Sequence, residues 1–256
     1  MTGVPDDAAL YRAMLQDHRV ALETLGGWFA SGPGCHVAGF PALPIELLNG
    51  IWVDPDGGDR SVGAFSELLD DLAHRGATPY VITLGPASPA VESEALRLGL
   101  TAVESLPMML VMPAWLTLPP DTGAMFTRET EPGAACGILA EGFEIVRKQA
   151  ASMLNEALLA REEVDVFLAC AGRTPTSTAT TLVAGEGAGV YLVATPPAHR
   201  GQGYGGAVTA HAVREAFGRG AAFAYLQASA MGYPVYRRLG FQERFRFTVF
   251  GRPAAA

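Results

Sequence analysis

The chain has 256 residues, of which 49% are hydrophobic and 17% are charged, and its formal net charge at pH 7 is −8. This composition supplies a large core and excludes an intrinsically disordered chain. No cluster of Lys and Arg offsets the negative charge, so neither nucleic acid nor an anionic membrane is expected as a partner.

The cysteines and the N-terminal residues indicate a cytoplasmic protein. Cys35, Cys136 and Cys170 are widely spaced and form no C-x-x-C pair. That pattern favours a reducing compartment and predicts neither a disulfide framework nor a metal site. The first ten residues lack the basic start and apolar block of a secretory signal, and no apolar stretch approaches the ~18 residues of a membrane span.

Residues 1–120 form a first half in which helices and apolar segments alternate. The helix predicted over 61–75 carries Phe65, Leu68, Leu69 and Leu72 on one face, and Ser61 is its candidate N-cap. The other predicted elements are a helix at 6–23, an apolar segment at 45–53, a strand at 80–84 and a helical segment at 88–100.

A Pro- and Gly-containing linker at 119–123 separates this half from a second one, residues 124–256. Here the alternation predicts a mixed α/β order, an α+β arrangement with a mixed sheet. The predicted elements are strand 125–129, helices 132–146 and 150–160, strands 165–171, 176–184 and 190–195, helix 203–219, strand 222–228, a short helix with Tyr236, and strand 244–250.

The junction between strand 190–195 and helix 203–219 is the most informative segment. It reads Arg200-Gly201-Gln202-Gly203-Tyr204-Gly205-Gly206 and leads directly into the helix. Glycines let the backbone approach a ligand closely, and the N–H groups at a helix N-terminus favour an anion. The segment therefore predicts a site for a phosphate or pyrophosphate.

Two nucleotide-binding motifs fail at this junction. The glycines fit G-x-G-x-x-G, but five residues separate them from the strand, and the next strand ends in Gln227-Ala228-Ser229 without a carboxylate for a ribose. A Walker loop is excluded because no Gly-Lys-Ser/Thr follows.

The spacing instead resembles the acetyl-CoA signature of the GNAT superfamily of N-acetyltransferases, R/Q-x-x-G-x-G/A, with Arg200, Gly203 and Gly205 at its defined positions. Downstream, a strand followed by a short helix with Tyr236 and ending in Leu239-Gly240-Phe241 is similar to the next element of that family. The resemblance covers residues 125–250, roughly, and implies a GNAT fold for the second half.

The first half resembles a degenerate second copy, as in tandem acetyltransferases. Arg97-Leu98-Gly99-Leu100 mirrors the end of the Tyr236 helix, but Gly57-Gly58-Asp59-Arg60 has no R-x-x-G-x-G and its acidic neighbours would repel a pyrophosphate. An unrelated α/β domain is the alternative for this half. The chain is thus expected to hold two GNAT-like halves, with acetyl-CoA bound to the second only.

The resemblance implies direct transfer of an acetyl group from acetyl-CoA to an amine in a ternary complex, with no metal. Tyr236 is implied as the proton donor to the departing thiolate. Ser229 stands where family members often have a cofactor-binding Asn, which weakens the match. The residues expected to bind the cofactor are Val193, Ala194, Thr195, Arg200, Gly201, Gln202, Gly203, Tyr204, Gly205, Gly206 and Ser229.

Several points stay open at this level. The base that deprotonates the amine is not selected among Glu141, Glu144, Glu156 and Glu186, while His199 and His211 are expected to be solvated. The acceptor is a small-molecule or peptide amine of unknown identity, and a homodimer is an open assembly. A non-catalytic CoA- or acyl-CoA-binding regulatory module and an enzyme that uses a longer acyl-CoA are the functional alternatives.

Overall fold

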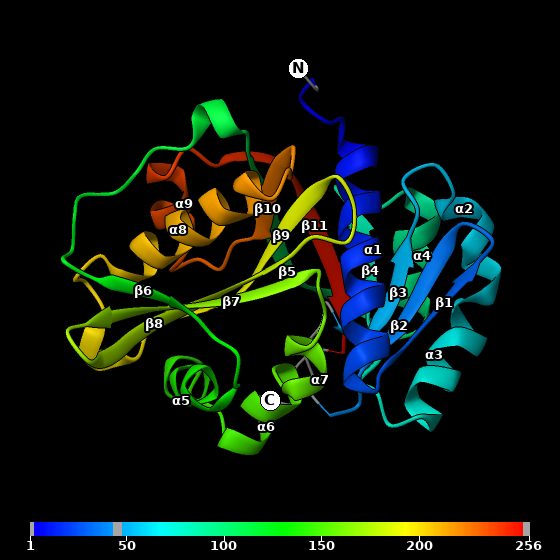
Figure 1. The fold of residues 1–256 in the computed structure, drawn as a ribbon. Coiled ribbons are helices and arrows are strands. Elements are labelled where there is room, and N and C mark those ends of the chain that lie inside the picture. Colours follow the sequence, from blue (N-terminus) through cyan, green and yellow to red (C-terminus); the bar gives the residue numbers. More distant parts are fainter. Residues whose placement is uncertain (1–2, 43–47, 253–256) are drawn as a thin grey trace. The chain divides into compact units, whose positions relative to one another are not determined.

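The computed structural model describes residues 3–42 and 48–252, and the chain in it forms two compact units that are each discontinuous in sequence (Figure 1). Unit 1 comprises Met1–Asp17 and Met109–Arg244, and unit 2 comprises His18–Met108 and Phe245–Ala256. The long helix α1 (Asp7–Leu25) and the strands β5 (Thr101–Val111) and β11 (Gln242–Gly251) contribute residues to both. The mixed α/β class predicted from the sequence is confirmed.

In unit 2, a strand order β1-β2-β3-β4-β11 is built mostly from antiparallel neighbours, but β3 and β4 run parallel. Phe65 and Leu72 from α3 pack with Ile51 and Val81 from the strands in one buried cluster. The remaining elements of this unit are β1 (Trp28–Gly32), β2 (Cys35–Gly39), β3 (Gly50–Val53), α2 (Gly58–Ser61), a 3₁₀ turn (Val62–Ala64), α3 (Phe65–His74), β4 (Val81–Leu84) and α4 (Pro89–Arg97).

Two expectations for this region need correction. Ser61 does not cap a helix that starts there, because it is the buried last residue of α2, and α3 begins at Phe65 after the 3₁₀ turn. Strands β1 and β2 were not predicted from the sequence. The apolar segment 45–53 includes β3, whereas residues 43–47 lie outside the described residues.

In unit 1 the strand order is β5-β10-β9-β8-β7-β6. Figure 1 shows α8 on one face of these strands and α5 on the other. The elements are β6 (Met125–Arg128), α5 (Gly133–Gly142), α6 (Arg147–Met153), α7 (Glu156–Leu159), β7 (Val164–Ala171), β8 (Thr174–Leu182), β9 (Gly187–Ala194), a 3₁₀ turn (Pro197–His199), α8 (Tyr204–Gly218), β10 (Phe223–Gln227) and α9 (Tyr233–Arg238).

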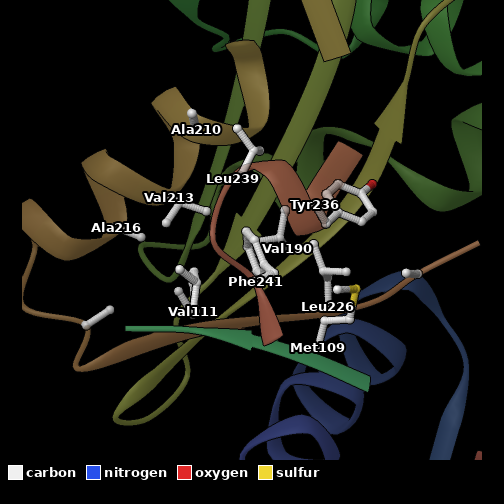
Figure 2. Close-up of a cluster of buried hydrophobic side chains, with 14 residues drawn as sticks. Met109, Val111, Val190, Ala210, Val213, Ala216, Leu226, Tyr236, Leu239 and Phe241 are labelled. Atoms are coloured by element: carbon white, nitrogen blue, oxygen red, sulfur yellow. The ribbon is translucent and has the colours of Figure 1, made fainter. Parts of the chain in front are cut away.

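The single helix predicted over 150–160 is wrong, since α6 and α7 replace it. The side chain of Asn155 accepts a hydrogen bond of 3.0 Å from the Leu158 N–H and so starts a new helix. The main core of unit 1 joins Val213 on α8, Val190 on β9 and Leu226 on β10, and Figure 2 shows these side chains converging.

Candidate functional site

Strands β9 and β10 pair along only part of their length. Parallel pairing joins Gly187–Gly189 to Phe223–Tyr225, whereas β9 continues to Ala194 and β10 to Gln227. Beyond Gly189, the described residues of β9 therefore have no strand pairing with β10. An unpaired strand edge can accept an extended, amide-bearing ligand as an added strand.

A bulge in β9 accompanies this separation. Thr180 on β8 pairs with Tyr191 and Thr178 pairs with Ala194, so Leu192 and Val193 together lie opposite the single residue Ala179. Leu192 has a φ of 51°, which is rare for a bulky residue. Bulges of this kind redirect the backbone and are common beside active sites. No residue in the sequence marks the bulge, and it was not predicted.

The glycine-rich loop ends in the N-terminus of α8. Gly203 is the N-cap, with a left-handed φ of 87° that favours glycine. In the described part of the chain, the N–H groups of Gly201, Gln202 and Gly203 donate to no protein acceptor. The next three N–H groups belong to the first helical turn, where intrahelical acceptors are absent. These six consecutive donors suit an anion such as a pyrophosphate.

The end of β9 is packed tightly against the start of α8. The hydroxyl of Thr195 lies 2.8 Å from that of Ser177, and a Cβ on Gly205 would lie only 3.0 Å from it. The Thr195 hydroxyl would therefore have to shift by a few tenths of an ångström to admit a side chain at Gly205. This close packing holds the loop donors beside the part of β9 that is not paired with β10.

The side chain of Arg200 is engaged by the protein itself. Its Nε donates to the Thr195 carbonyl at 3.1 Å, and its guanidinium NH₂ donates to the Gly142 carbonyl at 2.9 Å. Arg200 thus ties the end of α5 to the end of β9. Its backbone N–H donates to the Pro197 carbonyl at 3.3 Å, so the donors of the candidate anion site begin at Gly201.

Tyr236, on α9, is 9% exposed, and burial raises the pKa of its hydroxyl to about 12. Its ring belongs to the core, while Figure 2 shows its hydroxyl oxygen directed away from the cluster. Ser229 is exposed, and its Oγ accepts a 3.1 Å hydrogen bond from the Gly232 N–H. Ser229 therefore shapes the turn before α9.

The candidate glutamate bases and the two histidines differ in exposure and in ring contacts. All four glutamates left open by the sequence are exposed. His211 is not simply solvated as expected, because its ring stacks on Phe126 at a centroid distance of 4.4 Å and contacts Phe167 edge-on. Burial lowers its pKa. His199 lies in the 3₁₀ turn, with its ring 6.5 Å from that of Tyr204.

The parallel pair of unit 2 lacks the separation seen between β9 and β10. β3 and β4 stay paired through Val53 and Thr83. The cavity beyond these strand ends has a volume of about 390 Å³, and its charged lining residues are Asp54, Asp56, Asp59 and Arg60. The three carboxylates outweigh the one guanidinium, so the net negative charge opposes a phosphate.

Among the described residues, no group of three or more His, Cys, Asp or Glu side chains is arranged to hold a metal ion. Nor is any described helix sufficiently long and apolar to span a membrane.

Comparison with known proteins agrees with this geometry. The family model described as an acetyltransferase (GNAT) domain matches residues 133–244. No curated protein matches the chain.

Several solved structures share the fold. A GCN5-related N-acetyltransferase from Kribbella flavida has a TM-score of 0.77 and 21% identity, over 99% of this chain and 98% of that one. A GCN5-related N-acetyltransferase from Sphaerobacter thermophilus has a TM-score of 0.57 and 15% identity, over 97% and 93%. A tandem GNAT protein from the clavulanic acid biosynthesis pathway has a TM-score of 0.57 and 13% identity, over 81% and 76%.

The family match spans the end of β9, the glycine-rich loop and the helix with Tyr236, and the structural likeness extends over nearly the whole chain. The chain has the fold of GNAT proteins, and its residues 133–244 match the model of the acetyltransferase (GNAT) domain.

Proposed function

We propose that the protein is an acetyl-CoA-dependent N-acetyltransferase that moves the acetyl group to an amine within a ternary complex. The observation that carries this proposal is the separation of β9 from β10 beside an uncommitted helix N-terminus. This pair of features offers one surface for a chain of amides and one for a pyrophosphate, the two recognition elements of CoA.

Different backbone segments of unit 1 would bind the pantetheine arm, the pyrophosphate and the thioester carbonyl oxygen. The backbone of Val193, Ala194 and Thr195 would hydrogen-bond the pantetheine amides, and the loop from Gly201 to Gly206 would bind the pyrophosphate. The bound donor supplies a thioester carbonyl that an amine can attack. A backbone N–H near Val193 would stabilise negative charge on that carbonyl oxygen, an effect of roughly 3–4 kcal/mol at comparable sites.

Tyr236 would stabilise the leaving thiolate by donating a hydrogen bond to it. Because its pKa is raised to about 12, its hydroxyl is protonated throughout the neutral range and can donate to the departing thiolate. A thiol has a pKa of ~8.5, so this donation acts more as a hydrogen bond than as a full proton transfer. The role of Ser229 would be indirect, through the turn that places α9.

Unit 2 is proposed to bind no CoA. Its continuous β3–β4 pairing leaves no edge for pantetheine, and its acidic cavity opposes a pyrophosphate. On this proposal, unit 2 corresponds to the degenerate copy expected from the sequence. The domain boundaries at 1–120 and 124–256, a cytoplasmic location, a small-molecule or peptide amine as acceptor and the absence of nucleic-acid and membrane partners remain parts of the proposal, with homodimerisation open.

The competing candidate is a non-catalytic module that binds CoA or an acyl-CoA. It is favoured by the exposure of all four candidate glutamate bases, since none of them has the buried setting that tunes a proton acceptor.

A thiol-release assay with acetyl-CoA over a panel of alkylamines, amino acids, polyamines and aminoglycosides tests the proposal. Acetyl-CoA-dependent thiol release with at least one amine, together with the acetylated amine in the mass spectrum, is the expected result. Tight acetyl-CoA binding without turnover across the panel would favour the non-catalytic module. Turnover only with longer acyl-CoA donors would show that acetyl-CoA is not the acyl donor.

A further inference from the structure

Helix α1 places one buried carboxylate against the strands of the candidate site. Asp17 is 1% exposed and lies within unit 1. Its Oδ2 accepts a short hydrogen bond from the Tyr225 hydroxyl and lies 3.5 Å from the Tyr191 hydroxyl. Its Oδ1 accepts from the Ala184 N–H at 3.2 Å. The two tyrosines come from β10 and β9, the strands that separate.

This carboxylate lies over the closed end of the separation. Gly189 and Tyr225 form the last pair between β9 and β10. A Cβ on Gly189 would lie 2.5 Å from both Asp17 Oδ2 and the Tyr191 hydroxyl, so both groups pack directly on that residue. Only glycine leaves room for them, which gives this position a physical reason to lack a side chain.

The reacting group would lie on the same strand as Tyr191, if the proposed function holds. With the pyrophosphate at the N-terminus of α8, the pantetheine arm would run along β9 from Thr195 towards Val193, and the thioester would lie beside the Val193 N–H. Tyr191 is two residues further along β9, about 7 Å at roughly 3.3 Å each. The acceptor amine would therefore approach the thioester from the side of Tyr191.

The groups that hydrogen-bond Asp17 are neutral. They are the two tyrosine hydroxyls and the backbone N–H groups of Ala184 and Gly189. Burial raises the pKa of the Asp17 carboxyl to about 7, despite the hydrogen bonds that lower it. A carboxylate with this affinity for protons is a better base than an exposed glutamate near neutral pH.

We infer that Asp17 accepts the proton of the acceptor ammonium, with the Tyr191 hydroxyl as the relay between them. The ammonium gives a proton to the Tyr191 oxygen as the Tyr191 hydroxyl proton moves to Asp17 Oδ2, leaving a neutral amine and a neutral carboxylic acid. The amine nitrogen then forms a bond to the thioester carbonyl carbon and gives up one further proton as the C–S bond breaks. That proton passes to the departing sulfur, so CoA leaves as the thiol, and Asp17 returns its own proton to solvent after product release.

The Tyr191 hydroxyl is held less firmly than the Tyr225 hydroxyl. It lies 3.4 Å from the Tyr225 hydroxyl and 3.5 Å from Asp17, near the outer limit for a hydrogen bond, so its contact with Asp17 would have to shorten in the complex with substrates before a proton passes. Tyr225 is therefore assigned a positioning role, in which its donation stabilises the carboxylate.

The test compares the pH dependence of kcat/KM for wild type and Asp17→Asn, using acetyl-CoA and the primary alkylamine that reacts fastest in the panel. In wild type, kcat/KM should rise with pH and level off near pH 7. In Asp17→Asn, only free amine reacts, so the rate should be about 1,000-fold lower at neutral pH, given an alkylamine pKa of ~10.4, and should approach wild type near that pKa.

Two tyrosine variants distinguish a proton relay by Tyr191 from a merely structural role. Tyr191→Phe should reproduce the Asp17→Asn profile, whereas Tyr225→Phe should keep the plateau and move its onset to higher pH, because the carboxylate loses a donor. Thermal unfolding reports whether each variant folds.

A rate loss in folded Asp17→Asn or Tyr191→Phe that is equal at every pH would overturn the inference, because it would indicate a packing role. If no amine in the panel reacts even with wild type, the proposed function fails instead, and the inference falls with it.

Discussion

At the scale of single residues, Tyr236 combines a buried ring with a hydroxyl turned out of the core. Tyr236→Phe keeps the ring and deletes only the donor. We expect kcat to fall about 10- to 100-fold, the low end for a general acid, because a CoA thiolate leaves readily. The acetyl-CoA dissociation constant should not change.

The same comparison has a pH signature. Since the pKa of Tyr236 is raised to about 12, the hydroxyl stays protonated from pH 6 to pH 9, roughly, and the ratio of the two kcat values should be constant over that range. Steady-state kinetics at several pH values provides the check. A kcat within about twofold of wild type would leave Tyr236 as a packing residue.

The raised pKa of Asp17 also predicts how the free energy of unfolding depends on pH. Its folded pKa of about 7 lies above the ordinary value of 3.8, so the neutral form favours the folded state. The resulting stability is full below the unfolded pKa and is lost as pH rises through the folded one. Relative to Asp17→Asn, wild type should lose about 4 kcal/mol of unfolding free energy between pH 4 and pH 7.

Urea unfolding of both proteins at several pH values measures this difference. A free-energy difference between wild type and Asp17→Asn that does not vary with pH would mean that the Asp17 carboxyl titrates normally in the folded protein.

At the scale of elements, the loop before α8 depends on a left-handed glycine. Gly203→Val places a branched side chain at a φ of 87° and at the ligand-facing loop, so acetyl-CoA binding should be abolished. Gly220→Val is the matched control, because Gly220 also has a left-handed φ, 99°, but follows the other end of α8. Calorimetry on both folded variants should find binding only in the control. Unchanged affinity in Gly203→Val would contradict the assignment of the loop.

Local patterns made much of this region predictable. The helix expected over 203–219 is α8 (Tyr204–Gly218), and the strand expected over 222–228 is β10 (Phe223–Gln227). Apolar periodicity and glycine punctuation are local properties, and so they can be read from the residues themselves.

Features that depend on tertiary contacts were not predictable. Nothing in the sequence marks the left-handed Leu192 or the point at which β9 leaves β10, because both are set by pairing with other strands. The Arg200 guanidinium donates a hydrogen bond to the Gly142 carbonyl, which lies 58 residues away in the sequence. Asp17 lies 208 residues from Tyr225, and no spacing rule connects them.

At the scale of the whole molecule, the chain contains two parallel strand pairs of the same kind with opposite properties. One pair separates beside six uncommitted backbone donors, and the other stays paired beside three aspartates. Sequence comparison of the two glycine-containing loops anticipated the difference in charge. The difference in strand pairing is visible only in the structure, and it supports the same division of roles.

The most direct test is calorimetric titration of the full-length protein with acetyl-CoA. One site per chain is predicted, because only unit 1 combines an open strand edge with a donor-rich helix N-terminus. Two equivalent sites, or no binding by folded protein, would contradict the account.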